Sequence, residues 1–79
     1  MSGAHDQTVR KRSVTLAGHR TSLSLEEAFW RALKEEARGS GTSVNDLVAR
    51  IDRERQGNLS SAVRVHLFER ARAEPPPEK

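Results

Sequence analysis

The feature that most constrains this chain is a short alternation of polar and apolar side chains that runs without a turn into a helical pattern. The alternation covers residues 20–25, and the helical pattern begins at Glu26. In a β-strand successive side chains point to opposite faces. One face would carry Thr21, Leu23 and Leu25 toward a core. The opposite face would carry a guanidinium and two hydroxyl groups, from Arg20, Ser22 and Ser24, and these are group types that bond base edges in a DNA major groove.

A strand needs a partner because a lone strand leaves its backbone N–H and C=O groups unpaired. No second alternating segment of comparable quality occurs elsewhere in the chain. The sequence therefore predicts that two copies, related by a twofold axis, pair residues 20–25 antiparallel with themselves. The resulting ribbon would repeat Arg20, Ser22 and Ser24 on one face.

Size and composition support oligomerisation. With 79 residues, 34% hydrophobic composition and three aromatic side chains, one chain can bury only a small core. The chain has no cysteine, so neither disulfides nor a thiolate zinc site can compensate for the small core. No apolar run has the length of a membrane span, and the first residues lack the pattern of a signal peptide. A cytoplasmic protein is expected.

Positive charge is concentrated at the N-terminal end of the chain. Residues 1–25 contain four basic side chains and one acidic side chain, whereas residues 26–79 contain ten of each sign. The net charge of +3 therefore lies beside the candidate reading face. A concentrated positive field favours a polyanionic partner, because each neutralised phosphate releases condensed counterions.

Four segments are expected along the chain. Residues 1–18 form a flexible basic arm, because Gly18 interrupts a continuous strand into Arg20. Residues 19–56 form the core of the domain, and residues 57–73 form a helical extension. Residues 74–79 form a disordered tail, because the prolines at 75–77 prevent further helix.

Three helices are predicted, each from its apolar spacing and its end signals. The first runs from Leu25 or Glu26 to Arg38, before Gly39-Ser40-Gly41, with Phe29, Leu33 and Ala37 as a buried stripe that Trp30 broadens. The second follows a cap at Thr42 or Ser43, carries Val44, Leu47, Val48 and Ile51, and ends near Gln56-Gly57. The third begins at a cap on Asn58 and ends near Ala73, and its widely spread apolar positions indicate contacts with two surfaces.

This combination of strand, helix, Gly-x-Ser turn and capped second helix resembles the ribbon-helix-helix family of DNA-binding proteins, of the Arc, MetJ and CopG type. The residues that carry the resemblance are Arg20 to Leu25, then Phe29, Leu33 and Ala37, then Gly41 to Leu47. It looks most like a small bacterial subgroup with an extra C-terminal helix, through Lys11-Arg12-Ser13-Val14 and the segment from Asn58 to Val65. The implied fold is mostly α, with one N-terminal strand that pairs antiparallel across a homodimer.

The resemblance also implies roles for individual residues. Outward strand positions in the family contact bases, which maps onto Arg20, Ser22 and Ser24. Backbone N–H groups at the start of the second helix hold a phosphate, which maps onto Thr42, Ser43, Val44 and Asn45. Independently of the resemblance, the basic run and the position of His19 beside Arg20 predict further DNA contacts from the arm, through Arg10, Lys11, Arg12 and His19. The expected dimer core is Leu23, Leu25, Phe29, Trp30, Leu33, Leu47, Val48 and Ile51.

Other chemistries find little support in the sequence. His5, His19 and His66 are too scattered for a recognisable metal motif, and no cofactor is expected. Carboxylates such as Asp52 and Glu54 are interleaved with arginines at the spacing of solvated helix faces, and no nucleophile with a nearby base is apparent. The chain is therefore not expected to be an enzyme.

The sequence favours a homodimeric, sequence-selective DNA-binding regulator, most simply a transcriptional repressor, whose dimers can pack side by side on DNA. One alternative is an antitoxin whose segment after Gly57 binds a toxin. Another is a protein-interaction module without a DNA role. In the alternatives, residues 57–73 would provide the surface for a protein partner.

Overall fold

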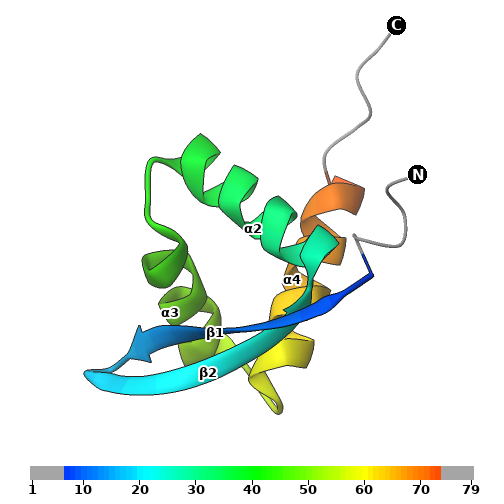
Figure 1. Ribbon diagram of the computed structural model, residues 1–79. Coiled ribbons are helices and arrows are strands. Elements are labelled where there is room, and N and C mark those ends of the chain that lie inside the picture. Colours follow the sequence, from blue (N-terminus) through cyan, green and yellow to red (C-terminus); the bar gives the residue numbers. More distant parts are fainter. Residues whose placement is uncertain (1–6, 74–79) are drawn as a thin grey trace, which may run out of the picture.

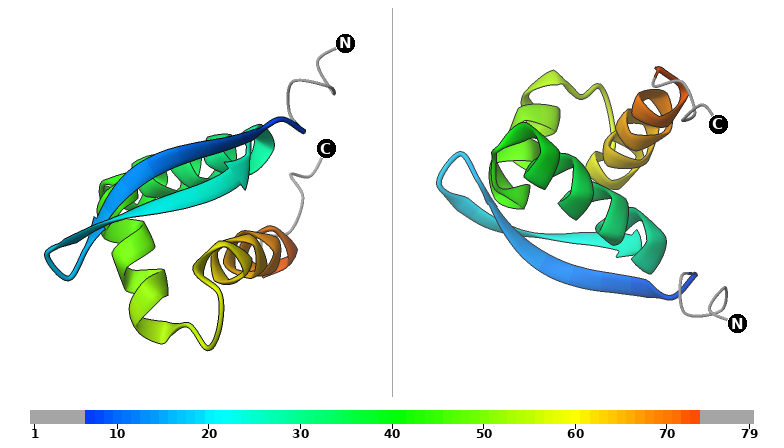
Figure 2. Two further views of the ribbon diagram at one scale, coloured as in Figure 1. Left: turned by 60° about the horizontal axis from the view of Figure 1, so that its bottom comes forward. Right: turned by 90° about the horizontal axis from the view of Figure 1, so that it is seen from above.

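The computed structural model describes residues 7–73 and consists of a β-hairpin followed by three helices (Figure 1). The strands are β1 (Val9–Leu16) and β2 (His19–Glu26). The helices are α2 (Glu27–Ser40), α3 (Val44–Glu54) and α4 (Leu59–Ala73). The right view of Figure 2 shows the helices on one side of the hairpin. On the other side of the hairpin, residues 11, 13, 15, 20 and 22 are exposed and Ser24 is half-buried.

A two-residue turn joins the two strands. The strands pair antiparallel from Leu16 opposite His19 to Val9 opposite Glu26. The turn residues Ala17 and Gly18 have φ angles of 53° and 81°. Two positive φ angles are the signature of the type I′ turn, whose twist matches that of the flanking strands. Gly18, expected to interrupt the strand, instead closes the hairpin, because glycine adopts this conformation without a steric penalty.

The pairing of β2 differs from the sequence expectation. Its partner is β1 of the same chain, and residues 9–16, expected in a flexible arm, form that strand. The strand was missed because its positions facing the helices at 10 and 12 are arginines, so β1 lacks the apolar alternation of β2. Residues 1–6 of the expected arm and the expected tail, residues 74–79, lie outside the described residues.

Trp30 on α2 explains how arginines can occupy the inner face of β1. The Arg12 guanidinium carbon lies 5.1 Å from the centroid of the Trp30 ring, and the Trp30 indole Nε1 donates a hydrogen bond of 3.0 Å to the Arg10 carbonyl oxygen. Arg10 Nε also contacts a carboxylate oxygen of Glu27 at 3.2 Å. A cation over an aromatic face stabilises by about 0.5–1 kcal/mol at exposed sites. The inner arginines therefore attach the hairpin to α2.

The hydrophobic core lies between the inner face of the hairpin and the helices. It contains Val14, Leu16, Leu23, Leu25, Trp30, Leu33, Ala37, Leu47, Val48, Ile51, Val63 and Leu67. Leu23 and Leu25 are only 1% and 0% exposed within a single chain. The side chains expected to form a dimer core are thus buried inside one molecule, apart from Phe29, which is half-buried. Pairing of β1 with β2 and packing of α4 supply the burial that was expected from a second copy.

The helix ends follow the signals in the sequence. Gly41 ends α2 in the left-handed conformation with φ 71°, and the Thr42 N–H donates to the Ala37 carbonyl at 2.9 Å. Ser43, of the two candidates, is the cap of α3, since its hydroxyl accepts from the Asp46 N–H at 3.0 Å. Asn58 caps α4 by accepting from the Ser61 N–H at 3.1 Å.

Helix α4 is an integral part of the folded domain. Its buried side chains are Val63 and Leu67. On its flank Arg64 Nε bonds Glu26 Oε1 at 2.9 Å. The hydrogen bond from Arg64 lowers the pKa of the Glu26 carboxyl below its usual value. Packing and this ion pair together hold α4 against the end of β2.

Candidate nucleic-acid interface

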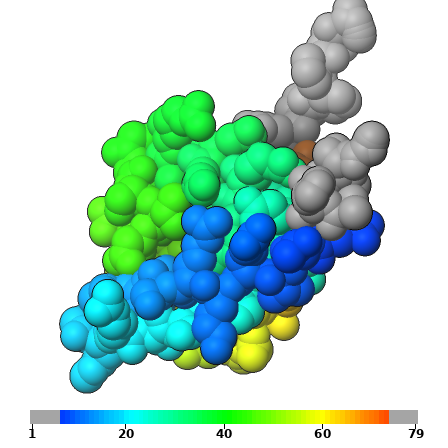
Figure 3. All heavy atoms as spheres, viewed as in Figure 1, coloured from blue at the N-terminus to red at the C-terminus, as the bar shows by residue number. Residues whose placement is uncertain are grey.

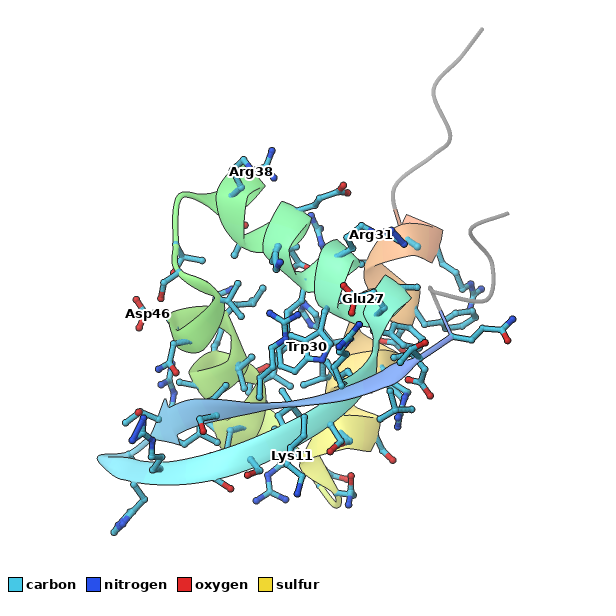
Figure 4. The ribbon with its side chains drawn as sticks, in the orientation of Figure 1. Lys11, Glu27, Trp30, Arg31, Arg38 and Asp46 are labelled. Carbon is cyan, nitrogen blue, oxygen red and sulfur yellow. The ribbon has the colours of Figure 1, made fainter. Side chains whose placement is uncertain are left out.

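The outward face of the hairpin is polar along both strands. The register places Lys11 opposite Ser24, Ser13 opposite Ser22, and Thr15 opposite Arg20. Because side chains alternate between faces, these six residues share the side of the hairpin opposite the buried Leu23 and Leu25. Ser22 also borders a hollow that is lined by residues of α3 and of the α3–α4 connection. All six are exposed except Ser24, which is half-buried. Figure 4 shows Lys11 on the opposite side of the hairpin from Trp30. We call these six side chains the outward face.

Only part of the outward face was anticipated from the sequence. Arg20, Ser22 and Ser24 lie together on it, as predicted for the base-contacting residues. Lys11, expected as a contact from a flexible arm, joins them from β1. Ser13 and Thr15 were not identified. If Ala17-Gly18 had been recognised as a two-residue hairpin turn, the pairing register of β1 with β2 would have followed. That register places Ser13 and Thr15 opposite Ser22 and Arg20.

The two cations of the outward face have no acidic partner in the part of the chain that the structure describes. Among residues 7–73, neither Lys11 nor Arg20 has a carboxylate partner. Glu26 lies on the same side at the end of β2, but its carboxylate is paired with Arg64. The outward face therefore presents two free positive charges among hydroxyl groups, an arrangement suited to an anionic partner that also offers hydrogen-bonding groups.

The remaining arm residues lie on the other side of the hairpin. Arg10 and Arg12 face α2 and contact Glu27 and Trp30. His19 alternates onto the same inner side, near the turn. There it borders a hollow of about 340 Å³ between the hairpin and the α3–α4 connection. The three basic residues at 10–12 therefore lie on two faces of the hairpin: Arg10 and Arg12 on the inner face, and Lys11 on the outward face.

The first turn of α3 has a limited set of free backbone donors. The Thr42 N–H is bonded to α2, and the Asp46 N–H is bonded to the Ser43 hydroxyl. The first N–H groups of a helix lack an intrahelical acceptor, and within residues 7–73 those of Val44 and Asn45 have no hydrogen-bond acceptor. Helix N-termini carry a partial positive charge and bind anions. Of the four residues expected to contact phosphate, Val44 and Asn45 have the backbone groups best placed to do so.

Asn45 also connects α3 to the hairpin through its side chain. The Thr15 N–H donates to Asn45 Oδ1 at 2.8 Å, and Asn45 Nδ2 donates to the Thr15 carbonyl at 2.8 Å. The side chain is therefore occupied by β1, and only its backbone N–H remains available to a ligand. These two bonds fix the start of α3 beside the outward face.

A basic hollow lies next to the start of α3. It has a volume of about 240 Å³. Its lining residues are Arg12, Ser13, Val14, Trp30, Lys34, Val44 and Asn45. Lys34, an exposed side chain of α2, was not identified from the sequence because its place in this hollow depends on how α2 packs beside α3. In Figure 3, the hairpin side chains run across the lower part of this face of the molecule, below α2 and α3.

Metal binding and membrane insertion find no support in the described part of the chain. Within residues 7–73, no group of three or more His, Cys, Asp or Glu side chains is placed to hold a metal ion. His66 bonds Glu36 at 2.8 Å on the flank of α4. None of the helices of residues 7–73 combines the length and the hydropathy that spanning a bilayer would need.

The comparisons with known proteins agree with this geometry. The family model described as "Ribbon-helix-helix domain" matches residues 9–71. The solved structure of an uncharacterized protein from Bordetella pertussis Tohama I is similar, with a TM-score of 0.78 and 29% sequence identity over 96% of this chain and 69% of that chain. No curated protein matches the chain. Ribbon-helix-helix domains are a non-enzymatic DNA-binding fold family, typically regulators or antitoxins, and they generally dimerise. Because the family match runs from the start of β1 to residue 71 in α4, well over half of the chain, this chain belongs to the ribbon-helix-helix family.

Proposed function

We propose that this protein is a sequence-selective DNA-binding regulator, most simply a transcriptional repressor, whose hairpin enters the major groove with the outward face toward the bases. The observation that supports this most directly is the pair of unneutralised cations, Lys11 and Arg20, among four hydroxyl side chains. Arg and Lys bond guanine O6 and N7, and hydroxyls bond several base edges. The function would require no cofactor.

The dimensions of the hairpin are compatible with this mode of binding. Neighbouring strands lie about 4.8 Å apart, and the major groove is about 12 Å wide and admits a two-stranded ribbon. In this chain both strands of the ribbon belong to one molecule. One protomer can therefore supply a complete reading element, and in a homodimer each copy would place its own hairpin on DNA.

Phosphate contacts would position the hairpin in the groove. The backbone N–H groups of Val44 and Asn45 are one donor set, and the adjoining hollow adds the cations of Arg12 and Lys34. Contacts to phosphates fix the register of a protein on DNA but carry no sequence information. In this proposal the start of α3 anchors the backbone, and the outward face discriminates between sequences.

Binding to a DNA duplex selected from a random pool, compared with a scrambled duplex, tests the proposal. We expect the wild-type protein to prefer the selected duplex, and Arg20→Ala to lose about 1–3 kcal/mol of that discrimination. The exposed Arg53 on α3 provides the control, since Arg53→Ala removes an equal charge that does not belong to the outward face. Equal affinity of the wild-type protein for both duplexes would exclude sequence-selective binding.

An exposed apolar pair on α4 supports a second candidate function, that of an antitoxin. Val65 and Phe68 are 53% and 60% exposed. Their spacing places them on one side of the helix, where a toxin would bind. Against this, α4 buries Val63 and Leu67 in the core, which favours a domain extension over a tail that orders only with a partner. Limited proteolysis of the free protein distinguishes the two, because an extension resists cleavage within residues 57–73.

A further inference from the structure

The two free cations of the hairpin hold a defined spacing. Lys11 lies opposite Ser24, and Arg20 lies opposite Thr15, on the same outward face. The two pairs are separated by four residues along the strands, which corresponds to roughly 13 Å at about 3.3 Å per residue. Lys11 and Arg20 belong to one chain and are joined through a two-residue turn, so this spacing does not depend on dimer formation.

The other basic residues of the hairpin do not compete for the same role. Arg10 and Arg12 are held on the inner face by Glu27 and Trp30. Lys11 and Arg20 are the hairpin's two outward-facing cations among residues 7–73, and both are exposed. The hairpin therefore has two strong hydrogen-bond donors for base edges, one near each end of the outward face.

Side chains between the two cations are short hydroxyls. Ser13 and Ser22 form the central pair of the outward face. A serine hydroxyl both donates and accepts, and it bonds either member of several base pairs. The central part of the hairpin consequently discriminates weakly, while the two ends discriminate strongly.

This pattern can be converted into a pattern of bases. Successive bases lie about 3.4 Å apart along the helix axis, so roughly 13 Å corresponds to about three to four base-pair steps. Arg and Lys most often contact guanine among the bases. If the hairpin reads DNA as proposed above, we infer that each protomer recognises two guanines three to four base-pair steps apart, one through Lys11 and the other through Arg20, with a tolerant segment between them.

The test is selection of bound duplexes from a random pool by the wild-type protein and by Lys11→Ala and Arg20→Ala. The wild-type pool is expected to show two guanine positions at the stated spacing. Each variant is expected to lose the preference at one position only, and at a different position from the other variant. The loss at that position should be about 5- to 150-fold in relative affinity. Arg53→Ala should retain both preferences, and circular dichroism confirms that each variant is folded.

Different results separate this inference from the proposed function. The inference would be overturned by selective binding without two guanines at this spacing, or by two variants that alter the same position. In either case the proposed function as a DNA-binding regulator would still stand. Binding without any sequence preference would overturn both. A duplex in which the two guanines are moved two steps further apart gives a second measurement, because the fixed register predicts that it loses one of the two contacts.

Discussion

The side-chain amide of Asn45 pairs with both backbone groups of Thr15, accepting from its N–H at 2.8 Å and donating to its carbonyl at 2.8 Å. A neighbouring antiparallel strand would form the same two hydrogen bonds, to the N–H and to the carbonyl of an edge residue. The amide therefore closes the free edge of β1 at this residue, and an unpaired strand edge is a site of unwanted association. It also fixes the start of α3 relative to the outward face. Thr15 thus has its backbone held by α3 while its side chain remains exposed.

Replacement of Asn45 by Ala removes both bonds at once. Each hydrogen bond contributes about 0.5–1.5 kcal/mol, so we expect the free energy of unfolding in urea to fall by about 1–3 kcal/mol. DNA affinity should also fall where the variant is still folded, because the start of α3 is no longer fixed beside the hairpin. Asn58→Ala is the matched control, since it removes the cap of α4 while both hydrogen bonds between Asn45 and Thr15 stay in place. Equal DNA affinities for the Asn45 variant and the wild type would contradict the positioning role.

The ion pair of Glu26 with Arg64 predicts a pH dependence of stability. The hydrogen bond from Arg64 lowers the pKa of Glu26 in the folded protein. Near the ordinary pKa of glutamate the unfolded chain then binds more protons than the folded chain, so stability increases with pH there. The contribution is complete above the ordinary pKa of about 4.3 and is lost as the pH falls through the lowered value. We expect Glu26→Gln to be less stable than the wild type at pH 7 and equally stable in strong acid.

Unfolding of both proteins in urea at a series of pH values measures this difference. Glu35→Gln provides the control, because Glu35 is an exposed residue of α2. A stability difference between Glu26→Gln and the wild type that persists in strong acid would show that the effect does not arise from the carboxylate charge.

Lys34 is expected to act on all DNA sequences alike. In the proposed complex it neutralises a phosphate beside the start of α3, so Lys34→Ala should weaken binding to selected and scrambled duplexes by a similar factor. The wild-type log–log slope of affinity against salt should be about −4 to −8 for a similar number of phosphate contacts, and the variant slope should be smaller in magnitude by about 1. Titrations at several salt concentrations measure both. An effect confined to the selected duplex would assign Lys34 to base recognition.

The two valines on α4 form a natural matched pair for testing whether α4 belongs to the domain. Val63 is 0% exposed and Val65 is 53% exposed. Val63→Ala should lower the free energy of unfolding by about 1–3 kcal/mol, through lost burial and a small cavity. Val65→Ala should change it by less than about 0.5 kcal/mol. Similar small effects of both substitutions would mean that α4 does not contribute to the core in solution.

The local elements of this fold were determined by the sequence. The alternation in β2 and the caps of α3 and α4 each act through neighbouring residues and lie where they were expected, with Ser43 the cap of α3 out of the two candidates. Helix α2 ends at Gly41 of the expected Gly39-Ser40-Gly41 signal, two residues later than predicted. The same holds for the common face of Arg20, Ser22 and Ser24, because alternation within one strand does not depend on its partner.

Only the tertiary structure decided which strand pairs with β2 and which basic residues face outward. Arg10 and Arg12 look like solvated charges in the sequence, yet the ring of Trp30 and the carboxylate of Glu27 hold them on the inner face. These contacts join residues about twenty positions apart, and no local pattern encodes such a distance. For the same reason the lysine between them reaches the outward face only once β1 pairs with β2, and Asn45 finds Thr15 only when α3 packs against the hairpin.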